Sequence, residues 1–462
     1  MGSENLERAK TSANNAWCPV PWISLGVRST GDVRYCCHAN GSAGKGLLKN
    51  SAGESLNLAT HAMSDGKNAP ILKDVRKVML EGKQPEGCAR CYREEKAGMY
   101  SRRHSEIFIW EPSITEEQAR SSTAPDGSIT EEDVPLRYLD LRFGNKCNLR
   151  CRMCGPTESD QWYDTYSKIW KANTFRDGEN EFEIFQDEAG EFKIKSDPYN
   201  WHDNADFWSG LDRYLPKMER LYFAGGEPLL IQRHFDLLTK CIEMGVAQNI
   251  TLEYNSNITA LNETILGIWS AFKFVEIGMS LDGVGEINEY IRHPSKWSQV
   301  QKKIKLLDEA KGNLSVWWAA TIQIYNMLHL PDMMSWIIAQ DFNRINRIPG
   351  GKSICAPHPL SNPNFLSVKV FPERSKAYIK QLFAEKKTLA AEQIMDSPHF
   401  DAAEKTDLVF RYDSILDSYV EYMMAEDLSH LMPKFWRYTN RMDEHYGTSL
   451  HSVCPRTFEL ML

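Results

Sequence analysis

Three cysteines lie close together in the middle of the chain, at Cys147, Cys151 and Cys154. Their C-x3-C-x2-C spacing brings three thiolates onto one short loop. Three sulfurs can hold three irons of a cubane cluster and leave the fourth iron open for a ligand that is not protein. A cluster that does chemistry needs such an open position, whereas an electron-transfer cluster is usually closed by a fourth Cys. No fourth Cys follows nearby, so the loop is a candidate reactive cluster site.

The segments on either side of this loop indicate how it is positioned. Residues 136–143 alternate apolar and polar side chains and predict a strand, so the loop leaves a strand end, where parallel barrels place their active sites. A second predicted strand, 220–224, leads into Gly225, Gly226 and Glu227. The two glycines let the backbone approach a ligand closely, and the carboxylate can accept hydrogen bonds from an ammonium group. A structural zinc knot is the alternative, but its usual paired C-x2-C halves are absent from this loop.

Together these features resemble the radical S-adenosylmethionine (radical SAM) superfamily, whose signature is C-x3-C-x2-C followed by a Gly-Gly-Glu-Pro strand end. In that family SAM chelates the open iron, and reductive cleavage gives methionine and a 5′-deoxyadenosyl radical that abstracts hydrogen from a substrate. The resemblance implies a SAM-binding 4Fe-4S cluster, SAM itself, and a reductase such as flavodoxin or ferredoxin as electron donor. It also implies an α/β fold, a partial (β/α)6 TIM-like barrel.

The resemblance extends through roughly residues 135–350, with further predicted strands at 249–257 and 273–283. By motif position it implies SAM-binding roles for Gly225, Gly226, Glu227, Asn255, Asn257, Ser280, Asp282 and Arg292. In peptide-modifying relatives an Arg at the offset of Arg292 pairs with the SAM carboxylate, which suits a planar fork of donors. A surface ion pair is the alternative for this residue.

One position departs from the family pattern. Met153 precedes the third cluster cysteine, where the family commonly has an aromatic residue, so we expect weaker stacking on the adenine. Gln323 and Ile324 follow the predicted strand 314–322 and are candidates to touch the adenosine, with ordinary packing as an equal alternative.

Five further cysteines lie in the first 91 residues: Cys18, Cys36, Cys37, Cys88 and Cys91. Between them the sequence predicts a hairpin that turns at Gly31-Asp32 and a helix over 70–82. A hairpin and a helix are too small to make a large core, and a bound metal or cluster would compensate.

This N-terminal segment resembles the twitch or SPASM accessory domain of radical SAM enzymes, although here it precedes the barrel. The resemblance implies an auxiliary 4Fe-4S cluster on Cys18, Cys36, Cys88 and Cys91. Side chains alternate along a strand, so only one of Cys36 and Cys37 should face the cluster, and motif position favours Cys36. An all-thiolate zinc site is the alternative. Three scattered thiols are expected to be incidental, although the last two are also candidates to complete a site: Cys241, Cys355 and Cys454.

At 462 residues, two or three domains are expected. We predict a small α+β twitch domain at 1–110, a linker at 111–134, the barrel at 135–372 and a helical tail at 373–462. An aromatic-rich insertion is predicted at about 156–216, with a hairpin over 179–195. The helical tail should include 412–424 and 428–446.

Composition narrows the setting of the protein. Eleven cysteines without a signal peptide fit a reducing compartment better than a disulfide framework, and no apolar run approaches membrane-spanning length. We therefore expect a cytoplasmic protein without a membrane partner. A net charge of -8 argues against a broad nucleic-acid surface.

The sequence favours a radical SAM enzyme that abstracts hydrogen from a peptide or an amine-containing metabolite, although no catalytic residue is assigned. Peptide chemistry rests on analogy with relatives that carry an accessory cluster. Radical modification of a nucleotide, sugar or nucleic acid is the alternative within enzymes. A non-catalytic iron–sulfur carrier is the alternative outside them, but a carrier has no need of a SAM pocket.

Overall fold

The computed structural model describes residues 15–39, 46–96, 101–170, 183–348 and 351–462. The chain divides into two compact units. The N-terminal unit comprises 1–145, 197–254 and 268–275, and the C-terminal unit comprises 146–196, 255–267 and 276–462. Strands β7 (Thr251–Ser256) and β8 (Phe274–Ser280) and helix α11 (Glu263–Trp269) cross from one range to the other. Each unit is described by itself.

The N-terminal unit is built on a sheet whose strands follow the order β2-β1-β3-β6-β7. The remaining bounds are β1 Ser24–Val27, β2 Val33–Arg34, β3 Tyr138–Leu141 and β6 Arg220–Phe223. Strands β1 and β2 form an antiparallel hairpin, whereas the β1–β3, β3–β6 and β6–β7 pairs are parallel. The predicted hairpin at Gly31-Asp32 is therefore confirmed, and its first strand joins the sheet of the first predicted barrel strand.

The two faces of this sheet differ in chemistry. Every residue of β1, β3 and β6 is buried, as expected for parallel strands covered on both sides. Leu139, paired with Leu221, lies on an apolar face. The next residue in register, Asp140, is paired with Tyr222, and Tyr222 with Glu253, so the opposite face is polar. Alternation along β3 thus places carboxylates and tyrosine on one side and leucines on the other.

Helices of the N-terminal unit follow the predicted pattern in part. Their bounds are α2 Val20–Ile23, α3 Met63–Lys67, α4 Pro70–Leu80, α5 Ala89–Lys96, α6 Arg102–Trp110, α7 Glu116–Ser121, α9 Ala205–Tyr214 and α10 Gln232–Glu243. Helix α4 confirms the predicted helix over 70–82: it begins at a Pro and is followed by Gly82 at φ 74°. The predicted linker 111–134 contains α7, which a Thr115–Gln118 capping box begins, so this stretch is not structureless.

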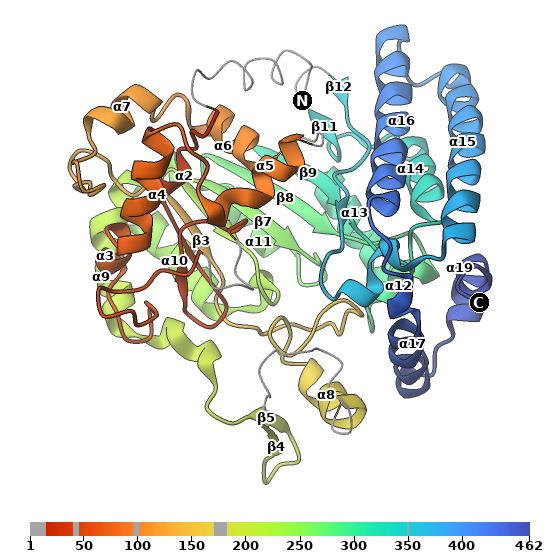
Figure 1. Cartoon of the computed structure of the whole chain (residues 1–462), viewed down its shortest axis with the longest axis horizontal. Helices are drawn as coiled ribbons and strands as arrows, with labels where there is room; N and C mark the ends of the chain where they lie inside the picture. The colour runs from red at the N-terminus through yellow and green to blue at the C-terminus, as the bar shows by residue number, and fades with distance from the viewer. Residues whose placement is uncertain (1–14, 40–45, 97–100, 171–182, 349–350) are drawn as a thin grey trace. The chain divides into compact units, whose positions relative to one another are not determined.

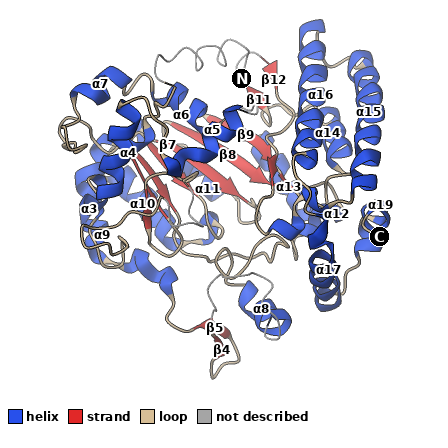
Figure 2. Cartoon of the chain, viewed as in Figure 1, coloured by secondary structure: helices blue, strands red, loops and turns tan. Residues whose placement is uncertain are grey.

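The C-terminal unit contains the end of β8 next to β9 (Leu314–Ala319), and several short strand pairs. Strand β10 (Thr321–Ile322) pairs in parallel with β13 (His358–Pro359), and β11 (Arg347–Ile348) pairs with β12 (Gly351–Lys352). In the predicted insertion, β4 (Ile184–Gln186) and β5 (Phe192–Ile194) form the expected hairpin beside helix α8 (Trp162–Trp170), as Figure 2 shows. Residues 179–182 of that prediction lie outside the described residues.

The end of the chain is helical, as predicted. The remaining helices are α12 Glu286–Ile291, α13 Trp297–Asp308, α14 Leu330–Ala339, α15 Glu373–Asp396, α16 Ala402–Met424, α17 Met432–Tyr446, α18 Leu450–Val453 and α19 Pro455–Leu460. Helices α15 and α16 lie side by side (Figure 1), and a capping box of Asp401 and Glu404 begins α16. Helix α17 ends at Gly447, whose left-handed conformation suits a residue without Cβ.

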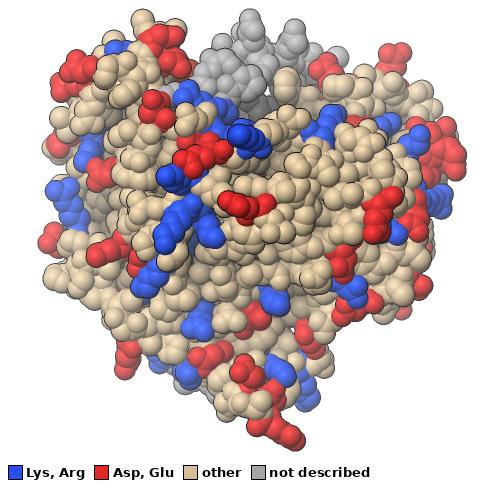
Figure 3. All heavy atoms as spheres, turned by 180° about the vertical axis from the view of Figure 1, so that it is seen from behind, with Lys and Arg blue, Asp and Glu red and all other residues tan. Residues whose placement is uncertain are grey.

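The expected α/β class is confirmed, with mostly parallel pairing in the main sheet. Barrel closure, the twitch domain and the domain boundaries stay predictions. Among the described residues, no helix is long and apolar enough to cross a membrane. On the face drawn in Figure 3, acidic and basic side chains are intermingled rather than gathered by sign.

Candidate functional site

The central cysteine loop follows β3 and belongs to the C-terminal unit. Cys151 is buried, and Cys147 and Cys154 are half-buried. The Cys154 amide donates to the Cys151 carbonyl at 2.9 Å, which closes a tight turn between them. Their thiols also share a hydrogen bond, which lowers the pKa of Cys151 and, together with burial, raises the pKa of Cys154. Two of the three predicted ligands thus already face each other.

Two polar side chains, one after strand β7 and one at the C-terminal end of helix α12, point at the sulfurs of this loop. The Asn257 amide lies 3.9 Å from Cys147 Sγ, and Arg292 Nη1 lies 3.9 Å from Cys151 Sγ. Asn257 also donates to the Asn148 side chain at 3.1 Å, which joins the end of β7 to the loop. Hydrogen bonds of this kind stabilise thiolates and tune a cluster that they hold.

Arg292 and Asp282 form a buried ion pair beside the loop, with Arg292 Nε 2.8 Å from Asp282 Oδ2. Burial alone lowers the pKa of Arg292, but the Asp282 carboxylate outweighs it and raises the pKa. The other oxygen of Asp282 accepts from the Thr321 amide at 2.7 Å. Because both side chains are almost fully inaccessible, this is not the surface pair considered from the sequence.

The other predicted SAM contacts of this unit lie at the ends of β7 and β8. Asn255 is exposed, and its Oδ1 comes so close to Gly278 that an added Cβ there would lie 2.7 Å away. Ser280 is half-buried at the end of β8. Gln323 is completely buried, yet neither polar atom of its side-chain amide has a hydrogen-bond partner among the described residues. A buried amide without a partner is costly, so this is a place where a ligand would be stabilising.

In the N-terminal unit, Gly225, Gly226 and Glu227 follow β6. Both glycines have positive φ, 80° and 54°. A Cβ on Gly225 would lie 2.9 Å from the Arg142 Cβ, so the sequence needs glycine there for packing as well as for conformation. Glu227 is buried, and its carboxylate accepts from the Leu229 amide at 3.2 Å. This turn and the central cysteine loop belong to different units and are not placed relative to each other.

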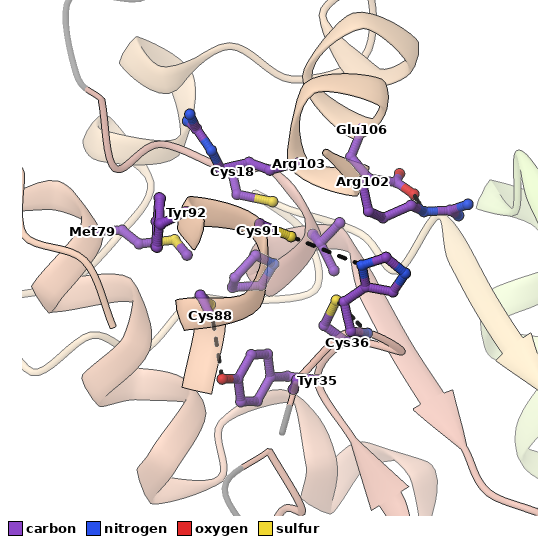
Figure 4. Close-up of a pocket in the computed structure, with 14 residues that line it drawn as sticks. Cys18, Tyr35, Cys36, Met79, Cys88, Cys91, Tyr92, Arg102, Arg103 and Glu106 are labelled. Atoms are coloured by element: carbon purple, nitrogen blue, oxygen red, sulfur yellow. Dashed lines mark hydrogen bonds and ion pairs between the residues drawn. The ribbon is translucent and has the colours of Figure 1, made fainter. Parts of the chain in front are cut away.

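Four N-terminal cysteines line a single cavity of the N-terminal unit (Figure 4): Cys18, Cys36, Cys88 and Cys91. The space between its walls measures ≈ 420 Å³, part of it open to solvent. These are the four residues predicted to hold the auxiliary cluster. Cys37 is not among the lining residues of this cavity. Both cysteines follow β2, which ends at Arg34, so alternation along a strand does not apply to them and the choice of Cys36 stays a prediction.

The thiols of this cavity are shielded from water. Burial raises the pKa of Cys88 and of Cys91 to about 11, and it also raises the pKa of Cys18 well above its usual value. A hydrogen bond with Cys36 lowers the pKa of Cys37 to about 7, and the nearby Arg102 acts in the same direction. Four thiols that line one cavity fit a metal or cluster, whose positive charge would stabilise their deprotonated forms.

A histidine that the sequence analysis did not single out also faces this cavity. His38 Nδ1 lies 4.0 Å from Cys91 Sγ, and the His38 amide donates to Cys36 Sγ at 3.4 Å. Ligand atoms of His38, Cys91 and Glu94 lie within 4.8 Å of one another, so a zinc ion also has suitable ligands here. The only sequence signal was that His38 directly follows two cysteines.

Sequence reasoning also missed a buried ion network on the polar face of the N-terminal sheet. Arg34, next to the hairpin cysteines, donates to Asp140 at 2.9 Å and to the Cys37 carbonyl at 3.3 Å. Arg102 reaches Glu253 at 3.4 Å, and Arg220 pairs with the same carboxylate at 2.9 Å. The network ties the hairpin to β3 and places charge beside the cysteine cavity. The sequence did contain one signal of this network, because Asp140 is a carboxylate between two leucines of the predicted strand.

Comparison with solved structures finds similar folds at low sequence identity. One is anSMEcpe with bound AdoMet, at 18% identity and a TM-score of 0.33, covering 54% of this chain and 60% of that chain. Another is anSMEcpe with bound AdoMet and the Cp18Cys peptide, at 11% identity and a TM-score of 0.31, covering 70% of this chain and 98% of that chain. SuiB of Streptococcus suis matches at 12% identity and a TM-score of 0.28, covering 78% of this chain and 68% of that chain.

The chain spans about 60% of the length of anSMEcpe in the first match. At TM-scores of 0.33 and below, the superpositions are too loose to place individual residues. No family model and no curated protein matches the sequence.

Proposed function

We propose that the protein is a radical SAM enzyme with a second, auxiliary iron–sulfur cluster. The observation that carries the proposal is the central cysteine loop with its polar neighbours: Cys147 and Cys151 each have a side-chain donor at 3.9 Å, and Cys151 bonds to Cys154. Three thiols on one short loop suit a cluster with one open iron.

Different residues of the C-terminal unit would bind the cluster and SAM. Cys147, Cys151 and Cys154 would hold the cluster, and Arg292, kept in place by Asp282, would present its guanidinium to the SAM carboxylate. The unpartnered amide of Gln323 would pair with a polar edge of the adenosine. Bound together, cluster and SAM would supply reductive cleavage to a 5′-deoxyadenosyl radical that abstracts hydrogen from the substrate.

The N-terminal cavity would hold the auxiliary cluster on Cys18, Cys36, Cys88 and Cys91. Four thiols complete the coordination of a cubane, so we propose that this cluster conducts electrons rather than binding substrate directly. A flavodoxin- or ferredoxin-like reductase would supply the electron. We propose a peptide or an amine-containing metabolite as substrate, by analogy with relatives that carry an accessory cluster.

Anaerobic reconstitution tests this function. With iron and sulfide restored, dithionite and SAM should yield 5′-deoxyadenosine, and the iron content should approach two cubanes per chain. A fully loaded protein that forms no 5′-deoxyadenosine would contradict the enzyme and favour a carrier. One zinc with a single cubane would contradict the auxiliary cluster and leave the SAM chemistry standing.

A further inference from the structure

Arg152, which follows the second cysteine of the central loop, is a buried charge. Its side chain is fully inaccessible, and its Nε donates to the Tyr290 carbonyl at 2.9 Å. The guanidinium carbon lies 3.6 Å from the centre of the Tyr290 ring. A charge in such a place is retained only where anions and acceptors surround it, since an unpaired one costs several kcal/mol. The loop therefore depends on the groups that neutralise Arg152.

The neutralising group comes from the helical end of the chain. Arg152 Nη2 lies 2.6 Å from Asp443 Oδ1, on α17, and 2.8 Å from Thr448 Oγ1 just after that helix. The Asp443 carboxylate is itself fixed, because it accepts from Thr448 Oγ1 and from the Leu450 amide, each at 2.8 Å. The ion pair joins residues 291 positions apart in the chain.

Helix α17 also holds the backbone of the same loop residue. The Tyr438 hydroxyl donates to the Arg152 carbonyl at 2.5 Å. On its other side, the Arg152 amide donates to the Ile291 carbonyl at 2.8 Å. Farther along α17, Tyr446 stacks on His293 with ring centres 4.0 Å apart. The turn between Cys151 and Cys154 is thus hydrogen-bonded through Arg152 to α17 and to the end of α12.

We propose that α17 is a working part of the central cysteine site: Tyr438, Asp443 and Thr448 form a clamp that sets the position of Cys151 and Cys154 through Arg152. These are positioning residues, because they act on the thiols through Arg152. The clamp is a property of the metal-free chain, and only its consequence for the cluster rests on the proposed function.

Asp443→Asn tests the clamp with little change of shape. The amide oxygen can still accept from Leu450, but the negative charge facing Arg152 is lost. In the metal-free protein, hydrogen exchange of the amides at 147–155 should become at least about tenfold faster, a larger change than in the rest of the chain. The matched control is Asp417→Asn on α16. Asp417 forms an exposed ion pair with Lys387 of α15, and its replacement should leave this exchange unchanged.

Tyr438→Phe removes only the hydroxyl that bonds the Arg152 carbonyl and should give a smaller change in the same amides, about threefold. It guards against a folding defect in the first variant. Exchange at 147–155 that stays within twofold of the wild type in both variants would overturn the clamp. Faster exchange spread evenly over the chain would also overturn it, because that result indicates general destabilisation.

A spectroscopic readout separates this inference from the proposed function. After reconstitution, the reduced-cluster electron paramagnetic resonance signal of Asp443→Asn should be broader than the wild type, and Asp443→Glu, which keeps the charge, should restore much of its shape. Identical signals in wild type and Asp443→Asn would overturn the clamp while the cluster assignment stands. If the wild type assembles no cluster on this loop, the proposed function fails, whereas the exchange result still decides the clamp.

Discussion

The central cysteine loop and the N-terminal cysteine cavity carry the same kind of ligand in opposite surroundings. At the central loop, charged and amide side chains point at the sulfurs, and a buried Arg292–Asp282 pair stands beside them. The N-terminal cavity has four thiols, and its exposed wall is largely apolar, although Arg102, Arg103 and Glu106 also line it. Polar groups around three thiols suit a site that takes a polar ligand, and an apolar wall around four suits a closed cluster.

The largest effect should follow from removing a central ligand. Cys151→Ala should reduce 5′-deoxyadenosine formation to background, because two thiolates hold a cubane poorly, and should lower the iron content by about one cubane. Cys241→Ala, which removes a buried thiol on α10, is the control and should keep both. Quantification by liquid chromatography and iron assay decides, and retained turnover in Cys151→Ala would refute the central site.

The neighbouring residues Cys36 and Cys37 test the ligand set of the N-terminal cavity. Cys36→Ala should lose the auxiliary cluster and keep some uncoupled SAM cleavage, whereas Cys37→Ala should keep both clusters, since Cys37 does not line the cavity. Iron and sulfide counts with electron paramagnetic resonance distinguish the variants. Equal loss in both, or loss only in Cys37→Ala, would contradict the assignment.

Acid should weaken the framework that carries the N-terminal cavity. Burial lowers the pKa of His234 to about 3, and its Nε2 lies 2.8 Å from the Tyr254 hydroxyl. Below pH 6.5 the unfolded chain binds this proton before the folded chain does, so stability falls as the pH drops toward 3. Between pH 7 and pH 5 the free energy of unfolding should fall by about 2 kcal/mol more in the wild type than in His234→Gln. Urea unfolding at both pH values measures it, and equal losses would contradict a buried neutral histidine.

The smallest effect is expected at the SAM contact. Arg292→Lys keeps the charge but not the planar fork, so the Kd for SAM should rise about tenfold. Equilibrium binding to the reconstituted protein measures this, with Lys305→Arg on the exposed side of α13 as the control. An unchanged Kd would show that Arg292 pairs with Asp282 and does not contribute to SAM binding.

Much of this arrangement follows from local sequence pattern. Apolar alternation predicted β3, and its extent differed from the structure by about two residues at each end. Apolar residues at helical spacing and a terminal Gly predicted α4 equally well. Cysteine spacing indicated the central group of thiols, because ligands on a short loop must lie near one another, whereas the N-terminal ligand set came from the resemblance to an accessory domain. Local pattern succeeds where the chain itself limits the distance between residues.

Long-range partners could not be predicted in the same way. Nothing near Arg152 indicates that its anion is Asp443, and a lone carboxylate on an amphipathic helix usually faces solvent. The parallel pairing of β1 with β3 is equally remote from any local signal. Asn257 was proposed for SAM, but its contact with Cys147 Sγ depends on where β7 ends relative to the loop. Such contacts are fixed by tertiary packing rather than by spacing.

The most direct test concerns the open iron itself. In a Cys88→Ala/Cys91→Ala double variant, the central cluster alone should remain, so its signal can be observed without interference. With SAM carrying ¹⁵N in its amino group and ¹⁷O in its carboxylate, electron–nuclear double resonance of the reduced cluster should show hyperfine coupling to both labels. Absence of coupling to either label, in a sample shown to contain the cluster and bound SAM, would contradict a cubane with one iron left free by the protein.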